Sequence, residues 1–274
     1  MSDEWRAVRV EQCASRDAVM AALFAAGSQG VHEDGDALVT HFPPDVDTAA
    51  VTSAIHAADA LAVVTVTDVP EVDWSEWRAN VSAHHVGRLV VTPPWQADGF
   101  DPATTIVIDP AMAFGTGEHP TTRGMLRLMQ RVVRVGDSVA DLGAGSAVLS
   151  IAAAKLGATR IAAIELDSGA EETAAENIRV NGVESSIRYL VGDATVLLAL
   201  VAPVRVVLAN IVSSVLMELL PQMAAALTDD GASVLSGILV EERDVMLRAI
   251  AASGLRVERE DVEGDWLSIL ALRI

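Results

Sequence analysis

The chain of 274 residues is 51% hydrophobic and 21% charged, which supports a sizeable buried core and argues against disorder. Its 38 acidic and 19 basic residues give a formal net charge of -19, which disfavours direct nucleic-acid binding because phosphates would be repelled. No uncharged apolar run reaches about 18 residues, and the N-terminus lacks a secretion signal, so neither a membrane span nor export is expected. The single cysteine, Cys13, excludes an internal disulfide and a cysteine metal cluster, and we expect a cytoplasmic protein without a metal site.

Residues 1–70 predict a small α+β domain whose elements follow the order βαββαβ, the ferredoxin-like pattern. The first helix should begin at Ser15, a favourable N-cap residue, and end at Gly27. An acidic Asp-Gly-Asp turn predicts a hairpin between the second and third strands. The expected strands are 5–10, 30–35, 36–42 and 60–69, and the expected helices are 15–27 and 45–58.

Residues 71–105 predict a connector that packs on the larger domain, because this stretch is too apolar for a free linker. Its segment RLVVTPPW predicts a strand that ends at the proline pair. His84 and His85 are adjacent, and neighbouring side chains on an extended chain point apart, so we interpret them as ordinary polar residues rather than metal ligands. The stretch also holds three of the five tryptophans: Trp74, Trp77 and Trp95.

Residues 106–274 alternate between strands and helices, which predicts a doubly wound α/β fold around a parallel sheet. The strands are apolar, as expected for strands that are covered on both faces. Residues 255–274 predict an antiparallel hairpin at the sheet edge, with an acidic Glu-Gly-Asp turn. The expected strands are 137–143, 159–167, 186–194, 204–211 and 231–240, and the expected helices are 146–157, 168–182 and 213–227, with a short helix before the fourth strand.

A glycine-rich loop follows the first strand of this sheet, at the edge where ligands bind in α/β folds. Gly143 and Gly145 match a dinucleotide-binding fingerprint, but Val148 stands where its third small residue would be. Asp141 leads the loop, and a carboxylate there would repel a pyrophosphate and attract a cationic amino group. The loop therefore favours a ligand with an α-amino group and no pyrophosphate, and S-adenosylmethionine has these features.

Two further carboxylates stand where an S-adenosylmethionine site would need them. Glu165 ends the second strand and can accept hydrogen bonds from both ribose hydroxyls. Asp193 follows the third strand and is placed to meet the adenine amino group. Each acid alone is equally consistent with a solvated strand end, but their order at successive strand ends favours the cofactor.

Asn210 ends the fourth strand, at a position that overhangs the methyl group in sheets of this kind. Its side-chain carbonyl can accept a hydrogen bond from an incoming amine and align the nitrogen lone pair for displacement at carbon. The alternative role is a cap for the following helix, although Ser213 and Ser214 would cap that helix as well. We interpret Asn210 as a candidate catalytic residue that orients the amine.

The segments that hold these residues resemble the ribosomal protein L11 methyltransferase family (PrmA-like). The resemblance is close over 109–274, looser over the connector and weak before residue 70. The glycine loop alone indicates only a class I methyltransferase, whereas AFGTGEHPTT is specific to this family and its near relatives. The matching stretches are DPAMAFGTGEHPTT, DLGAGSAVLSIAAAKLGA, ELD, ANI, LSGIL and the late GDW hairpin.

The resemblance implies a class I S-adenosylmethionine-dependent protein N-methyltransferase that modifies lysine ε-amino and N-terminal α-amino groups of ribosomal protein L11. It also implies that residues 1–70 recognise the protein substrate, that 71–105 connect, and that 106–274 carry out methyl transfer. The cofactor-holding positions of the family match these residues of the chain: Phe114, Gly115, Thr116, Thr122, Gly143, Glu165 and Asn210.

Three departures from the family pattern stand out. Ala147 replaces the third glycine of the usual Asp-x-Gly-x-Gly-Ser-Gly loop, and Glu165 replaces the usual aspartate with a carboxylate one methylene longer. The usual connector proline is replaced around His84 and His85. His119 could serve as a base, but we interpret it as structural.

Three other hypotheses stay open at this point. A methyltransferase of the same fold could act on another protein lysine or on a small amine, and the N-terminal domain would decide the target. A nicotinamide-dependent oxidoreductase is disfavoured by Asp141 and Val148. A non-catalytic binding protein is disfavoured by Asn210 and the FGTG stretch. Nothing in the sequence indicates an oligomeric state.

Overall fold

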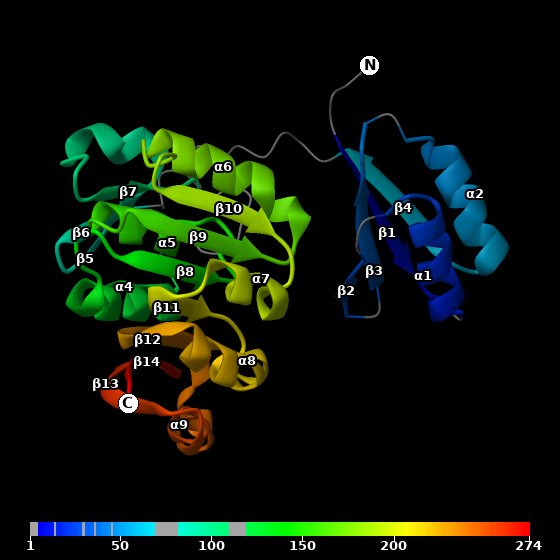
Figure 1. The fold of residues 1–274 in the computed structure, drawn as a ribbon. Helices are drawn as coiled ribbons and strands as arrows, with labels where there is room; N and C mark the ends of the chain where they lie inside the picture. Colours follow the sequence, from blue (N-terminus) through cyan, green and yellow to red (C-terminus); the bar gives the residue numbers. More distant parts are fainter. Residues whose placement is uncertain are drawn as a thin grey trace. The chain divides into compact units, whose positions relative to one another are not determined.

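The computed structural model describes residues 5–13, 15–28, 31–35, 37–44, 46–68, 82–109 and 119–274 (Figure 1). The chain divides into two compact units, Met1–Asn80 and Val81–Ile274, and each has a hydrophobic core of its own. Within the described ranges, no helix is long and apolar enough to cross a membrane.

The smaller unit is a four-stranded antiparallel sheet with two helices that pack together. Its elements are β1 (Arg6–Glu11), α1 (Arg16–Ala25), β2 (His32–Asp34), β3 (Ala37–Phe42), α2 (Thr48–Ala58) and β4 (Val63–Asp68). The strands lie in the order β2-β3-β1-β4, and β1 pairs antiparallel with both β3 and β4. The predicted βαββαβ order and ferredoxin-like topology are confirmed.

Alternation along β1 decides which face of this sheet is buried. Val8 and Val10 point to the same face because side chains alternate along a strand, and both are fully buried against residues of the two helices. Ser15 stands at the N-cap position of α1, but the predicted cap is wrong, because its side chain makes no capping hydrogen bond. Its backbone N–H donates instead to Asp59 Oδ2 at 2.8 Å, which ties the start of α1 to the end of α2.

The larger unit is built on a seven-stranded sheet. Its strands are β8 (Ser138–Leu142), β9 (Arg160–Glu165), β10 (Ile187–Val191), β11 (Val204–Asn210), β12 (Leu227–Leu239), β13 (Leu255–Glu263) and β14 (Trp266–Arg273). They lie in the order β10-β9-β8-β11-β12-β14-β13, with β8 to β12 parallel and β14 antiparallel to both of its neighbours. The predicted parallel sheet with an antiparallel hairpin at its edge is confirmed.

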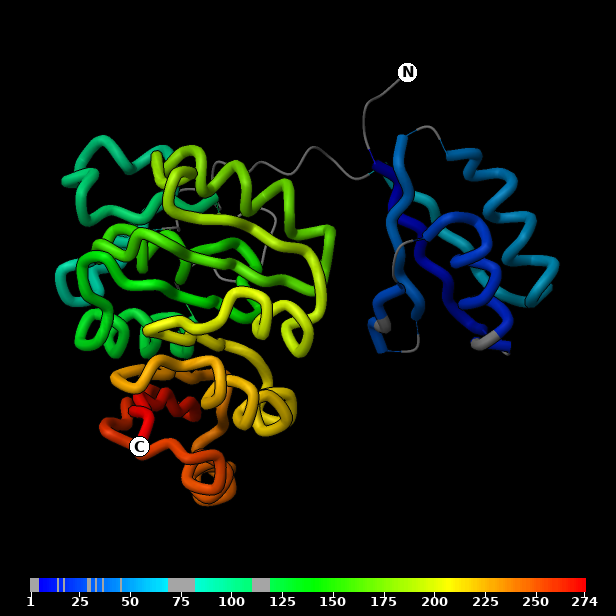
Figure 2. The backbone as a smooth tube through the Cα atoms, viewed as in Figure 1, coloured from blue at the N-terminus to red at the C-terminus, as the bar shows by residue number. Residues whose placement is uncertain are grey.

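Helices cover both faces of this sheet (Figures 1 and 2). One face packs against α4 (Pro120–Val132), α5 (Val148–Lys155) and α6 (Glu171–Val180), and the other against α7 (Ala194–Val201), α8 (Ser213–Ala226) and α9 (Arg243–Ala252). The two cores therefore lie on opposite sides of β8 and β11. Side chains of these two strands contribute to both cores. The sequence patterns did not predict α4 or α9.

The described part of the predicted connector belongs to the larger unit. It forms β5 (His84–Val86), β6 (Leu89–Thr92), the short helix η1 (Pro94–Gly99) and, with β7 (Thr105–Val107), a three-stranded sheet. As predicted, β6 ends where the proline pair begins. The Gln130 side chain of α4 holds this sheet by donating to Val86 O at 2.9 Å and accepting from the Arg88 backbone N–H at 2.9 Å. Trp74 and Trp77 lie outside the described residues.

Candidate active site

A cavity of about 430 Å³ opens at the carboxyl ends of β8, β9 and β11, the edge where open α/β sheets bind their ligands. Three of the predicted site residues line it together: Gly143, Glu165 and Asp193. The rest of the wall is mostly apolar and is formed by Leu142, Ile164, Leu166, Gly192, Ala194, Thr195, Ile211, Val212, Val215, Glu218 and Leu219. Apolar walls with a few carboxylates suit a flat heteroaromatic ring that carries polar groups at its edge.

The glycine loop closely approaches the turn that follows β11. Gly143 has a φ of +68°, and a Cβ there would lie 2.4 Å from Ile211 Cγ2. Gly237, in the LSGIL stretch, has a φ of +83°, and a Cβ there would lie 2.2 Å from the carbonyl oxygen of Ile211. Both positions require glycine, because a side chain at either one would push the turn away from the cavity.

Backbone groups fix the Glu165 carboxylate at the end of β9. The Gly145 N–H donates to Oε2 at 2.9 Å, and the Asp167 N–H donates to Oε1 at 3.0 Å. Gly145 therefore acts through Glu165 and is absent from the cavity wall itself. Each carboxylate oxygen retains a second lone pair, so both can still accept from the neighbouring hydroxyls of a ribose.

Asp193 is the N-cap residue of α7, and one of its carboxylate oxygens forms the cap. Its Oδ1 accepts from the backbone N–H of Thr195 at 2.8 Å and from the Thr195 hydroxyl at 2.7 Å. These hydrogen bonds from Thr195 hold the pKa of Asp193 below its usual range, so the carboxylate is ionised. Its Oδ2 has no partner among the described residues and is free to accept from a ligand amino group.

Two buried oxygen atoms at predicted cofactor positions have no hydrogen-bond partner among the described residues: Thr122 Oγ1 and Asp141 Oδ1. Buried polar atoms in folded proteins are nearly always satisfied. The other oxygen of Asp141 accepts from Ser150 Oγ at 2.7 Å. Burial raises the pKa of Asp141 to about 6, the Ser150 hydrogen bond opposes this rise, and the charge of Glu165 adds to it. This buried carboxylate needs a hydrogen-bond donor and a positive charge beside it. The ammonium group of S-adenosylmethionine would supply both, so the residues present fit this cofactor.

Asn210 lies half-buried at the end of β11, next to Ile211 of the cavity wall. Its side chain makes no hydrogen bond to any described residue. The capping alternative is wrong, because Val212 occupies the N-cap position of α8 without a side-chain cap. The expected serine cap is wrong as well, since the Ser213 hydroxyl donates to Glu242 Oε1 at 2.6 Å.

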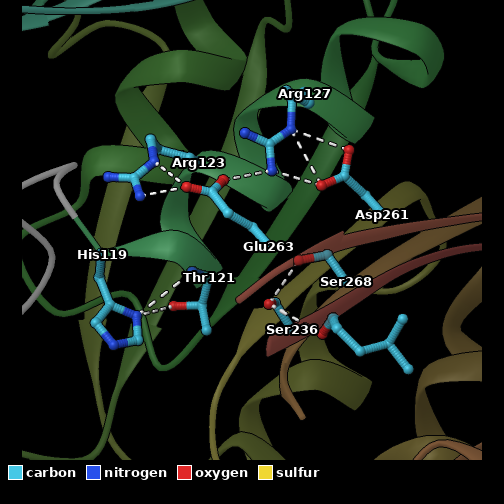
Figure 3. A network of polar contacts seen from close by, with 9 residues as sticks. His119, Thr121, Arg123, Arg127, Ser236, Asp261, Glu263 and Ser268 are labelled. Carbon is cyan, nitrogen blue, oxygen red and sulfur yellow. Dashed lines mark hydrogen bonds and ion pairs between the residues drawn. The ribbon is translucent and has the colours of Figure 1, made fainter. Parts of the chain in front are cut away.

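A charged network that was not predicted from the sequence joins α4 to the C-terminal hairpin (Figure 3). Arg123 Nε donates to Glu263 Oε1 at 2.8 Å, and Arg127 donates to Glu263 Oε2 at 2.8 Å and to Asp261 Oδ2 at 2.9 Å. Residues four apart share a helix face, and residues two apart share a strand face. These two spacings, arginine on one element and acid on the other, were the available signal.

His119 is the N-cap residue of α4, the helix that carries Thr122. Its Nδ1 lies 2.8 Å from the Thr121 hydroxyl and accepts from the Thr121 backbone N–H at 3.4 Å (Figure 3). Its ring meets the Trp266 ring edge-on, with 5.0 Å between centroids. These contacts support the structural interpretation of His119. The predicted pocket residues Phe114, Gly115 and Thr116 lie outside the described residues.

Two features together define a class of enzyme. One is the strand order, in which the antiparallel β14 lies between β12 and β13, and the other is the glycine loop that follows Asp141. The chain is a class I S-adenosylmethionine-dependent methyltransferase. Among the residues that the structure describes, no group of histidine, cysteine, aspartate or glutamate side chains is arranged to hold a metal ion.

Comparison with known proteins gives the family. The model of the family described as ribosomal protein L11 methyltransferase (PrmA) matches residues 7–273. A ribosomal protein L11 methyltransferase from an Exiguobacterium strain is 36% identical over 211 residues, 76% of this chain and 67% of that protein. One from Pelotomaculum thermopropionicum is 38% identical over 226 residues, 81% of this chain and 72% of that protein. The crystal structure of a ribosomal protein L11 methylase from Lactobacillus delbrueckii subsp. bulgaricus matches with a TM-score of 0.62 and 29% identity, covering 70% of this chain and 98% of that one. The chain belongs to the ribosomal protein L11 methyltransferase (PrmA) family.

Proposed function

We propose that the chain transfers methyl groups from S-adenosylmethionine to ribosomal protein L11, at lysine ε-amino groups, at the N-terminal α-amino group, or at both. The observation that carries the proposal is the family match from residue 7 to residue 273, which includes the smaller unit as well as the cofactor-binding unit. Two relatives with names that state this activity are matched over 67% and 72% of their lengths.

Residues of the cavity wall, together with the buried Asp141 and Thr122, divide the contacts with the cofactor between them. Glu165 accepts from the ribose hydroxyls, and Asp193 accepts from the adenine amino group through its unpartnered Oδ2. Asp141 and the backbone of the glycine loop hold the amino-acid end, where Thr122 supplies a further polar contact. The family resemblance implies that residues 114–116 also contribute to the cofactor pocket. Support comes from the orphaned oxygens of Asp141 and Thr122 and from the geometry around Glu165.

The bound cofactor supplies a methyl group that is electrophilic because it sits on a sulfonium. The task of the protein is to present a neutral amine in line with that methyl group. Asn210 orients this amine by accepting one of its N–H groups, and its lack of other hydrogen bonds among the described residues supports this role. The departing proton leaves to water.

The division of labour follows the chain. Residues 1–70 recognise the protein substrate, 71–105 connect, and 106–274 carry the chemistry, in a cytoplasmic protein that does not bind nucleic acid directly. The net charge of -19 supports this, because a basic protein substrate would be attracted and nucleic acid repelled. The second candidate target is another protein lysine or a small amine, bound by the same site.

The decisive experiment incubates the full chain with purified L11 and isotope-labelled S-adenosylmethionine, and maps the label by mass spectrometry of peptides. We expect whole methyl increments on L11 lysines or on its first residue. A second ribosomal protein of similar basic charge is the matched control for non-specific attraction, and Glu165→Ala is the control for cofactor dependence. A parallel incubation uses a whole ribosomal fraction, and label on its other proteins with L11 unmodified would transfer the assignment to the alternative target.

A further inference from the structure

A second cavity, of about 480 Å³, lies at the opposite ends of the parallel strands from the cofactor cavity, where β11 and β12 begin. Arg205 contributes to it from the start of β11, whereas Asn210 ends the same strand at the cofactor edge. The remaining wall comes from the end of α4, the first part of β12 and the hairpin of β13 and β14. We call this cavity the basic pocket. It shares no lining residue with the cofactor cavity.

The charge of the basic pocket is opposite to that of the chain. The whole chain has twice as many acidic as basic residues, but five arginines line the pocket against two carboxylates. One of these carboxylates, Glu258, is already paired with Arg256, which stands outside the wall, at 2.8 Å. The five arginines are Arg131, Arg134, Arg205, Arg259 and Arg273.

Arg205 is the buried member of this group, with 8% of its side chain exposed. Its Nε donates to Asp230 Oδ2 at 3.1 Å, which fixes the plane of the guanidinium. Its Nη1 is buried without a hydrogen-bond partner, and Nη2 also has no partner among the described residues. A buried guanidinium nitrogen without a hydrogen-bond partner is costly, and an anion in the pocket would offset that cost.

Asp230 does not neutralise the pocket, because its single carboxylate is shared. It accepts from Arg205 and, at 3.4 Å, from Arg134, and its other oxygen accepts from the Thr228 hydroxyl at 3.1 Å. The exposed Arg131 and Arg259 form no ion pair or hydrogen bond with any described residue. Two guanidiniums without partners among the described residues therefore line the same pocket as the partly satisfied Arg205.

We propose that the basic pocket binds a phosphate-type dianion, either inorganic phosphate or a compact phosphomonoester. Guanidinium groups present paired N–H donors that match the oxygen atoms of phosphate. Proteins commonly bind phosphate dianions with several arginines. The ligand is small, because a polynucleotide would bring many phosphates against a chain of net charge -19.

The test is calorimetric titration of the full chain with inorganic phosphate, at an ionic strength held constant with sodium chloride. We expect saturable binding to the wild-type chain. Arg259→Gln should weaken it by about tenfold, the loss that follows from one charge-assisted hydrogen bond, and Arg131→Gln combined with Arg259→Gln should abolish it. Both side chains are exposed, so these variants should fold even where Arg205→Gln does not.

Arg248→Gln is the matched control, because Arg248 is also exposed and unpaired among the described residues but lies on α9, away from the pocket. It should leave phosphate binding unchanged. A parallel titration with glycerol 3-phosphate distinguishes the sources: binding shows that the pocket accepts esters, and its absence restricts the ligand to free phosphate.

The proposal is overturned if phosphate binding is absent or unsaturable, if Arg248→Gln weakens it as much as Arg259→Gln does, or if only an RNA oligonucleotide binds in an arginine-dependent way. None of these readouts involves methyl transfer, so a negative result leaves the proposed function unaffected.

Discussion

Asp141 has an environment that opposes its charge. Its side chain is fully buried, one carboxylate oxygen has no partner among the described residues, and burial raises its pKa to about 6. An ionised acid in such a place lowers the stability of the folded state, and a cationic ligand group beside it offsets that cost. Ligand binding therefore explains this residue better than folding does.

Asp141→Asn should raise the free energy of unfolding near neutral pH and weaken S-adenosylmethionine binding. The pKa rises from 3.8 in the unfolded chain to about 6 in the folded one, so the folded state binds more protons between these values. Wild-type stability therefore falls as pH rises through this window and stays reduced above it, by an amount on the order of 2–3 kcal/mol, which the amide avoids. Urea denaturation at pH 4 and pH 8, with calorimetry of cofactor binding, measures both effects. A variant that loses stability equally at both pH values and binds normally would contradict this account.

Asn210→Ala should reduce turnover without a loss of stability. The side chain makes no hydrogen bond to described residues and does not cap α8, so its removal leaves folding nearly unchanged. If its carbonyl aligns the amine, turnover at saturating cofactor should fall roughly tenfold, as the loss of one good hydrogen bond implies. The matched control is Ser214→Ala, at an exposed position in the first turn of α8, which should keep wild-type turnover. Normal turnover in Asn210→Ala would remove this residue from the catalytic step.

The C-terminal hairpin and α4 are held together by charge as well as by packing. Glu263 accepts from Arg123 and Arg127, and these ion pairs, with that of Arg123 first, hold its pKa below the usual range. All three side chains are about two-thirds buried or more, so the pairs are screened less than surface pairs. The hairpin therefore supports α4, the helix that carries Thr122.

Glu263→Gln should therefore destabilise the chain by about 1 kcal/mol at neutral pH. Because the folded pKa of Glu263 is lowered, the wild-type advantage is present above the unfolded value of 4.5 and is lost as pH falls through the folded value. Denaturation of both chains across this range measures it. Glu176→Gln breaks an exposed pair with Arg179 on α6 and should cost less stability than Glu263→Gln, because solvent screens an exposed pair. Equal losses in the two variants would mean that the network adds nothing beyond surface pairing.

The sequence was informative about elements wherever the hydrophobic pattern and a boundary residue agreed. All the strands of the parallel sheet were predicted, because apolar runs alternate with helices, two of which end at Gly157 and Gly182. The helices α4 and α9 lack the usual N-cap residues, because α4 is capped by His119 and α9 begins after Glu242 without a side-chain cap. Pro120, at the first position of α4, was a start signal that the sequence interpretation did not use. The serine caps at Ser15 and Ser213 were wrong: the Ser15 side chain makes no capping hydrogen bond, and the Ser213 hydroxyl donates to Glu242, a partner distant in the sequence.

The site was predictable to the level of strand ends and no further. Parallel strands bring Gly143, Glu165 and Asp193 to one edge, so their order along the chain was sufficient to group them. The orphaned oxygen of Asp141 and the bond from Gly145 to Glu165 depend on side-chain placement within the packed fold. The basic pocket was not predictable, because its arginines come from positions 131 to 273 and meet only through the strand order.

At the scale of the whole molecule, the chain has two units with separate cores. The core of the smaller unit lies within residues 8–64, and the two cores of the larger unit lie within residues 86–272. All described residues of the cofactor cavity and of the basic pocket belong to the larger unit. Cofactor binding should thus be separable from recognition of the protein substrate.

A chain truncated to residues 81–274 should fold and bind S-adenosylmethionine with the affinity of the full chain but fail to methylate L11. The cavity, its glycine loop and both cores remain, so nothing that holds the cofactor is removed. What is lost is the ferredoxin-like unit, to which we assign capture of the substrate. Calorimetry with the cofactor and mass spectrometry of L11 after incubation measure the two properties on one preparation, and intact cofactor binding serves as the control for folding. If the truncated chain methylates L11 at the rate of the full chain, recognition lies in the larger unit, and the smaller one needs another role.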